Sequence, residues 1–446
     1  MAEESIATCD RMRDCRNNHH PMRILHTSDW HLGQTLHQYE RGHEHARFLD
    51  WLLGTLESEK VDALLIAGDI FDNTNPSAAS QQQLYRFLQQ ARVRVPHLAI
   101  VMTAGNHDSP GRIEAPGPLL SLLDASAIGS VGPFGRSADE SDPAAQLERL
   151  IVPLKDGTGQ IAAWCIALPF LRPTDLPRVE KDAGDADEGG DAYLAGMAEL
   201  HRRAWQLASE RRQPGQAVIA MGHCHLRGGQ VSEESERKLV VGGSEILPAA
   251  LFDPGIAYVA LGHLHLAQRV GGDETRRYCG SPLPLSFSEV DYPHQVLLIE
   301  LAGEAVASVR ELRVPRAVEL LRVPSQPAPL QQALSELAAL ELPARSEAEQ
   351  PYLQVRVLLE RPEPGLRAQI EETIAGKPLR LVRIETRHAR SGEAEAAPTV
   401  TVEELAALAP ADFFGRLYRH RFGSEPEPAL MQAFGELLQQ AQEGAQ

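Results

Sequence analysis

Five short polar clusters, each placed directly after an apolar run, constrain the fold of this chain more than any other feature. The runs end at Gly or polar residues and cover residues 23–25, 63–67, 98–102, 217–221 and 256–261. Continuous apolar runs of this length are typical of strands that are covered on both faces of a sheet. The sequence therefore predicts an α/β fold with polar clusters at its strand ends.

The polar clusters consist mainly of Asp, His, Asn and Gly. They occupy residues 29–31 (DWH), 68–72 (GDIFD), 105–108 (GNHD), 222–223 (GH) and 262–265 (GHLH). Ligands of open α/β sheets bind outside the carboxyl ends of the strands, so we expect the clusters to meet there. Carboxylate, amide and imidazole donors suit Mn, Fe, Co or Zn. Two such ions about 3.5–4 Å apart can activate water and clamp a phosphate, so the clusters predict hydrolysis of a phosphate ester.

Chemistry alone suggests roles for two of these residues. Asp69 lies in a central cluster, and its two carboxylate oxygens can bridge two cations. His107 follows the expected ligand Asn106, so the two side chains should diverge in an extended turn. An imidazole beside the metal ions can protonate a leaving oxygen or stabilise a charged phosphate. His107 would need an orienting carboxylate, for which Asp72 and Asp108 are both candidates.

The sequence around the clusters resembles a known family. Residues 22–33 (MRILHTSDWHLG) look like the opening of the SbcD family, the nuclease subunits of bacterial SbcCD complexes. That family belongs to the calcineurin-like metallophosphoesterases. The resemblance continues through residues 68–72, 105–108, 262–265 and 278–287 (YCGSPLPLSF), and it covers most of the chain from Met22 onward.

The resemblance implies a complete set of site residues. One metal ion would be bound by Asp29, His31, Asp69 and His265. The other would be bound by Asp69, Asn106, His223 and His263. His107 matches the catalytic histidine that is not a ligand. Archaeal and eukaryotic relatives often carry His where this chain has Asp72. The wider phosphoesterase family has Asp there, where it supports the catalytic histidine. We favour this supporting role for Asp72. The cofactors would be two divalent metal ions, with manganese as the expected ion.

The expected fold class is α/β, with three folded parts after an N-terminal extension. Residues 22–312 would form a layered β-sandwich metallophosphoesterase domain that is flanked by helices. Residues 313–390 would form a small α+β domain that caps the site and helps to hold DNA, and residues 391–446 a linker with C-terminal helices. Between the clusters, apolar spacing predicts helices at residues 43–56, 81–90 and 115–123.

The C-terminal third has its own pattern. Four prolines, Pro315, Pro324, Pro327 and Pro329, predict a linker. The segments that follow are a helix at 330–340, a strand at 352–359, a helix at 365–375 and a strand at 379–386. Beyond the acidic linker at residues 391–395, we expect helices at 402–408, 412–422 and 428–441. The cap carries arginines that either meet DNA phosphates or are merely solvated: Arg356, Arg361, Arg367, Arg380 and Arg383.

Partners follow from the same resemblance. Short amphipathic helices cannot form a core alone, so the C-terminal helices should dock on an SbcC-type coiled-coil ATPase or pack back on the cap. A homodimer within a heterotetramer is also implied. Its contacts would come from helices after the second and third clusters, with four candidates: Leu84, Phe87, Leu119 and Leu122.

Composition limits the number of domains and the cellular compartment but does not indicate a function. A chain of 446 residues should hold two or three domains. It has no apolar stretch long enough to span a membrane, no signal-peptide pattern and five cysteines without a disulfide framework, so a cytoplasmic, nucleoid-associated protein is expected. The net charge of −18 is unusual for an enzyme that contacts nucleic-acid phosphates. The acidic residues between Glu180 and Asp191 should form a solvated loop away from the polar clusters. Since the net charge gives no support for DNA binding, the prediction of a DNA substrate depends on the resemblance.

Residues 1–21 are polar and precede the family pattern. The positions of Cys9, Cys15, His19 and His20 do not match a standard zinc finger. We expect a disordered extension here, or a start codon assigned too far upstream.

The implied activity is that of a manganese-dependent DNA nuclease. It would act as a 3′-to-5′ exonuclease on duplex ends and as an endonuclease on single strands and hairpins, in DNA repair, recombination and replication. Two alternatives stay open. One is a phosphoesterase for proteins, nucleotides or other monoesters. The other is a non-catalytic scaffold for an ATPase, although such scaffolds often lose a ligand and none is missing from this sequence.

Overall fold

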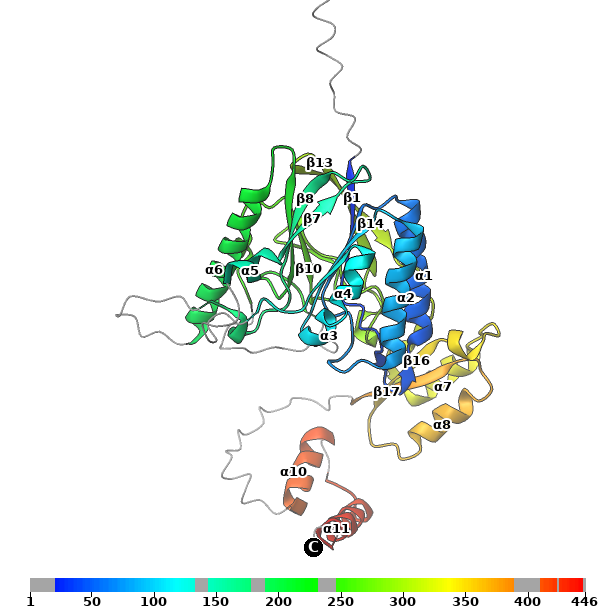
Figure 1. The fold of residues 1–446 in the computed structure, drawn as a ribbon. Helices are drawn as coiled ribbons and strands as arrows, with labels where there is room; N and C mark the ends of the chain where they lie inside the picture. The colour runs from blue at the N-terminus through cyan, green and yellow to red at the C-terminus, as the bar shows by residue number, and fades with distance from the viewer. Residues whose placement is uncertain are drawn as a thin grey trace, which may run out of the picture. The chain divides into compact units, whose positions relative to one another are not determined.

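Two six-stranded mixed sheets, packed face to face, carry the polar clusters (Figure 1). The computed structural model describes residues 21–132, 143–177, 189–231, 246–388, 410–422 and 425–443. By its internal contacts the chain divides into two units, Met1–Ala317 and Val318–Gln446. Several expected features lie outside the described residues: the extension at residues 1–20, the acidic loop from Glu180 to residue 188, the linker at 391–395 and the helix at 402–408. Asp191, which was expected in the same loop, lies in the helix α6 (Gly189–Arg211) instead.

The first sheet contains the strands that the first three apolar runs form. Its order is β14 (Ala305–Arg313), β13 (Gln295–Ala302), β1 (Met22–Thr27), β4 (Ala63–Ala67), β5 (Ala99–Thr103) and β6 (Ala125–Ile128). The strands β1, β4, β5 and β6 are parallel, and β13 and β14 complete the sheet in antiparallel fashion. Since Thr27 pairs with Ile66 and Ala67 pairs with Thr103, the three cluster-bearing strands end at nearly the same level.

The second sheet repeats this plan with the last two apolar runs at its centre. Its order is β11 (Gln268–Val270), β12 (Asp273–Tyr278), β10 (Tyr258–Gly262), β9 (Ala217–His223), β8 (Ile161–Ala167) and β7 (Ile151–Lys155). The central strands β8, β9, β10 and β12 are parallel. Gly262 pairs with His223, so the fourth and fifth clusters also end together. All five predicted strands are thereby confirmed.

Helices cover the outer faces of both sheets (Figure 1). On the first sheet lie α1 (Gly42–Ser58) and α2 (Ala78–Arg94), and α6 (Gly189–Arg211) packs against the second sheet. The first unit also contains α5 (Pro143–Glu148) and the short hairpin of β2 (Thr35–Leu36) and β3 (Tyr39–Glu40). Trp30, inside the first polar cluster, is fully buried against Phe48 of α1 and Phe87 of α2. The predicted helices at 43–56 and 81–90 are confirmed.

The third predicted helix, at residues 115–123, is confirmed only in part, because it is broken and not continuous. The structure has three short pieces instead: α3 (Pro110–Glu114), α4 (Gly117–Leu120) and the 3-10 turn η1 (Ser121–Leu123). Pro116 and Pro118 lack the backbone N–H that a continuous helix needs. This break leaves Leu119 and Leu122 exposed, at 69% and 77%.

The second unit is a βαβαβ arrangement. It contains β15 (Leu320–Pro329), α7 (Leu330–Ala339), β16 (Tyr352–Leu359), α8 (Leu366–Thr373) and β17 (Arg380–His388). The three strands are parallel, with β16 in the middle. The linker predicted around the four prolines is wrong, because Pro324, Pro327 and Pro329 lie in β15. An edge strand tolerates proline, since one of its sides needs no N–H donors.

Two further helices follow, α10 (Pro410–Phe422) and α11 (Pro428–Glu443), close to their predicted bounds. Phe414 of α10 stacks on Phe434 of α11, with ring centroids 4.2 Å apart. Among the described helices, none is both long and apolar enough to cross a membrane.

Candidate metal centre

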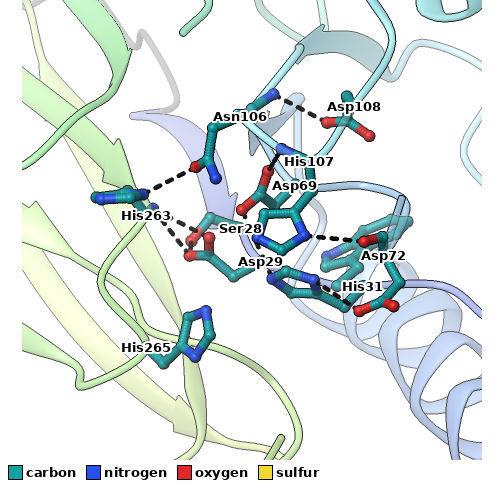
Figure 2. Close-up of polar contacts among 12 residues, drawn as sticks. Ser28, Asp29, His31, Asp69, Asp72, Asn106, His107, Asp108, His263 and His265 are labelled. Carbon is teal, nitrogen blue, oxygen red and sulfur yellow. Dashed lines mark hydrogen bonds and ion pairs between the residues drawn. The ribbon is translucent and has the colours of Figure 1, made fainter. Parts of the chain in front are cut away.

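The clusters converge where the ends of the two sheets face each other, and Figure 2 shows this for the first, second, third and fifth. The fourth joins them through the contact of His223 with Asn106. Asp29, Asp69 and Asn106 follow β1, β4 and β5 of the first sheet. His223 ends β9, and His263 directly follows β10, both in the second sheet. The site is therefore built from both sheets at once, as the carboxyl-end rule predicts.

The first two clusters hold each other in an unusual backbone conformation. Asp29 N donates to Gly68 O at 3.0 Å, and His31 N donates to Asp69 O at 3.0 Å. Asp29, His31 and Asp69 have φ angles of 54°, 47° and 48°. Left-handed backbone is uncommon outside glycine and recurs at active sites, where the surrounding structure enforces it. These paired loops aim the side chains of both clusters into one space.

Two glycines let the sheet ends approach this closely. At Gly68, where φ is 84°, a Cβ atom would lie 2.1 Å from His223 Nδ1. At Gly262 a Cβ atom would lie 1.9 Å from the carbonyl oxygen of Ala67. Both distances are far below van der Waals contact. Any side chain at either position would push the two sheets apart.

The side chain of Asn106 contacts two imidazoles of the second sheet. Its Oδ1 lies 3.0 Å from His223 Nε2. The same oxygen lies 3.0 Å from His263 Nδ1 (Figure 2). Asp69 Oδ2 lies 3.4 Å from His223 Nε2. These four side chains are the set that the resemblance assigns to the second metal ion.

The other predicted set also comes together beside Asp69. Asp69 Oδ2 lies 3.6 Å from His31 Nε2. Donor atoms of Asp29, His31 and His265 lie within 4.8 Å of one another. His31 Nε2 is buried and has no hydrogen-bond partner. Because a buried polar atom normally has a partner, a nitrogen in this position suits a metal ligand.

Charge at the centre is concentrated on Asp69. Burial alone would raise the pKa of Asp69, but His223, His31 and His107 hold it well below its ordinary value. Burial lowers the pKa of His223, and the Asp69 carboxylate outweighs that effect and raises it to about 9. Burial, with the neighbouring His223, lowers the pKa of His263 to about 3. Divalent cations would displace the proton that His223 holds, because a ligating histidine must be neutral.

Partners behind the imidazoles fix which nitrogen faces the site. His31 Nδ1 lies 3.2 Å from Asp72 Oδ1, and His223 Nδ1 lies 2.9 Å from Ala67 O. Both partners only accept hydrogen bonds, so both Nδ1 atoms carry the proton and Nε2 is left for a cation. His265 is held in the same way by Glu289, at 2.8 Å. Sequence reasoning missed Glu289 because it lies in no motif.

His107 is fixed beside the ligands. Its backbone N donates to Asp69 Oδ1 at 2.8 Å, and its Nδ1 donates to the backbone carbonyl of Asp72, also at 2.8 Å. Its ring lies 4.8 Å from that of His31, centroid to centroid. Asp72 was expected to support His107 with its carboxylate. The structure gives that contact to the Asp72 carbonyl oxygen and places the carboxylate on His31 (Figure 2).

Asp108 was the other candidate for that support, and it has a different task. Its carboxylate accepts from the backbone N–H groups of Ile70, Phe71 and Gly105, at 2.9–3.1 Å. Burial, together with the charge of Asp69, raises the pKa of Asp108 to about 6. Asp108 thus ties the second cluster to the third by hydrogen bonds to both loops.

The donor set fits two divalent cations. Carboxylate, amide and imidazole groups surround Asp69, whose Oδ2 lies between the two halves of the set. This mixture of N and O donors suits first-row transition metals. An orphaned buried nitrogen on His31 supports the same conclusion.

Comparisons with known proteins agree with this geometry. Residues 22–267 match the calcineurin-like phosphoesterases, and residues 316–422 match the family described as type 5 capsule protein repressor C-terminal domain. Among solved structures, a crystal structure of TT1561 of Thermus thermophilus is similar at 14% identity and a TM-score of 0.35. The match covers 66% of this chain and 100% of that one. A likeness at this level carries no functional conclusion.

Three similar relatives share one description, the D subunit of the nuclease SbcCD. The relative from Rhodobacter capsulatus is 40% identical, over 89% of this chain and 94% of its own length. The Escherichia coli K12 relative is 34% identical, over 66% and 68%. The Bacillus subtilis 168 relative is 31% identical, over 68% and 72%. The chain belongs to the calcineurin-like phosphoesterases and, within them, to the SbcD family of nuclease subunits.

Proposed function

We propose that this chain is the nuclease subunit of an SbcCD-type complex and that it hydrolyses DNA phosphodiesters with two divalent metal ions. One observation carries the proposal. The similarity to the SbcD nuclease subunit of Rhodobacter capsulatus extends over 89% of the chain, so it includes both the unit with the metal centre and the unit that follows it.

The proposed ligands divide into two sets around Asp69. Asp29, His31 and His265 would hold one ion, and Asn106, His223 and His263 the other, with Asp69 shared. When bound, the two ions would supply Lewis-acid activation of water and neutralise charge on the phosphate. Manganese is the ion that we propose, because the donor set suits it and the family resemblance implies it.

His107 would act on the leaving oxygen. Its Nδ1–H is committed to the Asp72 carbonyl, which holds the ring in place and leaves Nε2 to face the reacting group. When the ring is protonated at both nitrogens, Nε2–H can donate a proton to the departing oxygen of the cleaved phosphodiester. Asp72 would position both histidines, because its backbone carbonyl contacts His107 and its carboxylate contacts His31.

The arginines of the cap differ in how available they are to DNA. Arg356 is largely buried and paired with Glu385 at 3.1 Å, and Arg380 lies over the ring of Tyr352 at 3.9 Å. Both have structural tasks within the second unit. Arg361 and Arg367 are exposed, and we propose them, ahead of Arg356 and Arg380, as the groups that meet DNA phosphates.

For the homodimer we propose a contact through Leu119 and Leu122. Both are exposed leucines on one short segment, and such apolar side chains favour burial in an interface. Leu84 and Phe87 were also candidates, but each is only 2% exposed and belongs to the core. We expect Leu122→Glu to shift the full-length chain from dimer to monomer in light scattering, whereas the exposed Leu417→Glu on α10 should not.

We propose that α10 and α11 dock on the SbcC-type ATPase. They contact each other through Phe414 and Phe434 but leave four apolar side chains exposed: Phe413, Leu417, Leu430 and Leu437. An amphipathic helix pair of this kind suits a hydrophobic groove on a partner. We also propose that the complex acts in the cytoplasm, at the nucleoid.

The deciding experiment uses end-labelled duplex and hairpin DNA with Mn²⁺ or Mg²⁺, with and without the ATPase. A nitrophenyl phosphate ester serves as the monoester control. We expect cleavage of both DNA substrates, with release of nucleotides from the 3′ ends of the duplex. Turnover of the monoester without any DNA cleavage, even with the ATPase present, would favour a phosphomonoesterase instead.

A further inference from the structure

Glu289 is a buried carboxylate that touches one of the proposed ligands. It ends the 3-10 turn η4 (Phe287–Glu289), is 0% exposed, and its Oε1 lies 2.8 Å from His265 Nδ1. An ionised carboxylate only accepts hydrogen bonds, so His265 Nδ1 is the donor. Nε2 of His265 is then the nitrogen without a proton, as a metal ligand requires.

The other oxygen of Glu289 organises its own loop. Oε2 accepts from the backbone N of Leu285 at 2.7 Å. His294 spans the base of the loop, with Nδ1 2.9 Å from Ser281 O and Nε2 3.1 Å from Glu289 O. Ser281 N donates to His265 O at 3.1 Å. Residues 281–289 are thus folded back onto the end of the fifth cluster.

The residues that flank the β2–β3 hairpin, between the first cluster and α1, hold the same loop from the other side. Arg41 Nη1 donates to Pro284 O at 2.6 Å, and Gln34 Nε2 donates to Leu285 O at 3.0 Å. Arg41 is itself buried in an ion pair with Glu44. Gln34 and Arg41 come shortly after the first cluster in the sequence. Residues 281–289 therefore connect the loop of Asp29 and His31 to His265.

We propose that Glu289 is a positioning residue of the metal centre. It holds His265 in one tautomer and one orientation, so that Nε2 faces the same cation as Asp29 and His31. Gln34 and Arg41 keep its loop in place. This inference rests on the proposed ligand set. Removing the carboxylate partner of a ligating histidine typically weakens metal binding or activity about 10- to 100-fold.

The test is Mn²⁺ titration calorimetry on the full-length chain and its Glu289→Gln variant. His265 Nδ1 and Leu285 N contact different oxygens of Glu289, and glutamine replaces one of these oxygens with an NH₂ group that only donates. We expect one of two Mn²⁺ ions to bind about 10- to 100-fold more weakly and the other to bind as before. The matched control is Asp156→Asn. Asp156 is a buried carboxylate that accepts from Thr158 and Gln160 in the β7–β8 turn, and its loss should change neither Mn²⁺ affinity.

A His265→Ala background separates positioning from a general structural role. If Glu289 acts through His265, Glu289→Gln should cause no further loss of Mn²⁺ affinity once His265 is gone. Equal losses in both backgrounds, or unchanged binding of both ions by Glu289→Gln, would overturn the proposal. If Glu289→Gln shows no cooperative melt, Gln34→Ala replaces it. Gln34→Ala should weaken the same Mn²⁺ ion less than about tenfold, and unchanged binding there would also overturn the proposal.

Cleavage assays on the same proteins keep this inference apart from the proposed function. A wild-type chain that binds two Mn²⁺ ions but cuts no DNA, with or without the ATPase, would remove the nuclease function. The positioning role would stand if Glu289→Gln still weakened one ion. A wild-type chain that cuts DNA, together with unchanged Mn²⁺ binding by Glu289→Gln, would remove only the positioning role.

Discussion

The two sheets contribute to the metal centre in different ways. Among the proposed ligands, the first sheet supplies every oxygen donor and one imidazole: Asp29, Asp69, Asn106 and His31. The second sheet supplies imidazoles only: His223, His263 and His265. All negative charge among the proposed ligands therefore comes from the first sheet. The second sheet completes each site but brings no carboxylate among the proposed ligands.

This difference has a consequence for substitutions. Loss of a first-sheet carboxylate should weaken the attraction for cations as well as remove a donor. Loss of a second-sheet imidazole should remove one donor from one ion. The shared residue Asp69 should show the contrast most clearly, because its Oδ2 lies near imidazoles of both sheets.

We expect the largest effect from Asp69→Asn, which should abolish binding of both Mn²⁺ ions. DNA cleavage should fall by more than about 10⁴-fold, since enzymes accelerate such reactions by at least about 10⁶-fold. His223→Ala is the second-sheet counterpart and should lose one ion only. Calorimetric Mn²⁺ stoichiometry checks both variants. Equal stoichiometries in the two variants would break the contrast between the sheets.

His107→Ala tests a first-sheet residue that we propose is not a ligand. Cleavage should fall about 10²- to 10⁴-fold, the usual contribution of a general acid. Binding of both Mn²⁺ ions should be retained, because His107 lies outside both proposed ligand sets. Measured rates with end-labelled DNA, next to Mn²⁺ titrations, separate the two effects. Full cleavage by a clean His107→Ala preparation would remove the assigned role.

Removal of metal should loosen the packing between the sheets, since each ion draws ligands from both. At Mn²⁺ concentrations about 100 times the dissociation constant, binding of one ion adds about 2.7 kcal/mol to the free energy of unfolding. We expect EDTA to lower the melting temperature of the wild-type chain in differential scanning fluorimetry. Asp69→Asn should show no such response. A chelator-sensitive melting temperature in that variant would contradict the shared role of Asp69.

Asp72→Asn should have the smallest effect. It weakens the carboxylate contact to His31 but keeps the backbone carbonyl that holds His107. We expect about a 10- to 100-fold loss in Mn²⁺ affinity, with cleavage largely recovered at high Mn²⁺. A cleavage defect that persists at saturating Mn²⁺ would show that the carboxylate supports His107 as well.

Much of the site could be predicted because its signals are local. Each cluster directly follows an apolar run, and strands of a sandwich bring such ends together without further information. The ligand sets converge as the resemblance implied, although only the structure shows that His263 presents Nδ1 where His223 presents Nε2.

The misses have physical reasons. Glu289 lies 24 positions after His265 and approaches it only because residues 281–289 fold back, a contact that no periodicity signals. The β15 strand contains prolines that indicate a linker, and its position at a sheet edge is invisible in the sequence. Leu84 and Phe87 have the apolar character of interface residues, but in this fold that character serves the packing of α2 on the core.

The glycines at the sheet ends bear on any attempt to build this centre elsewhere. A designer who copied the seven donor residues onto another sandwich would still fail if residues with side chains stood at the positions of Gly68 and Gly262. Their Cβ atoms would collide with His223 and with the Ala67 carbonyl before the donors could meet. The minimum graft is therefore the donors together with these two empty positions, and a search for undiscovered relatives should weigh the glycines as heavily as the ligands.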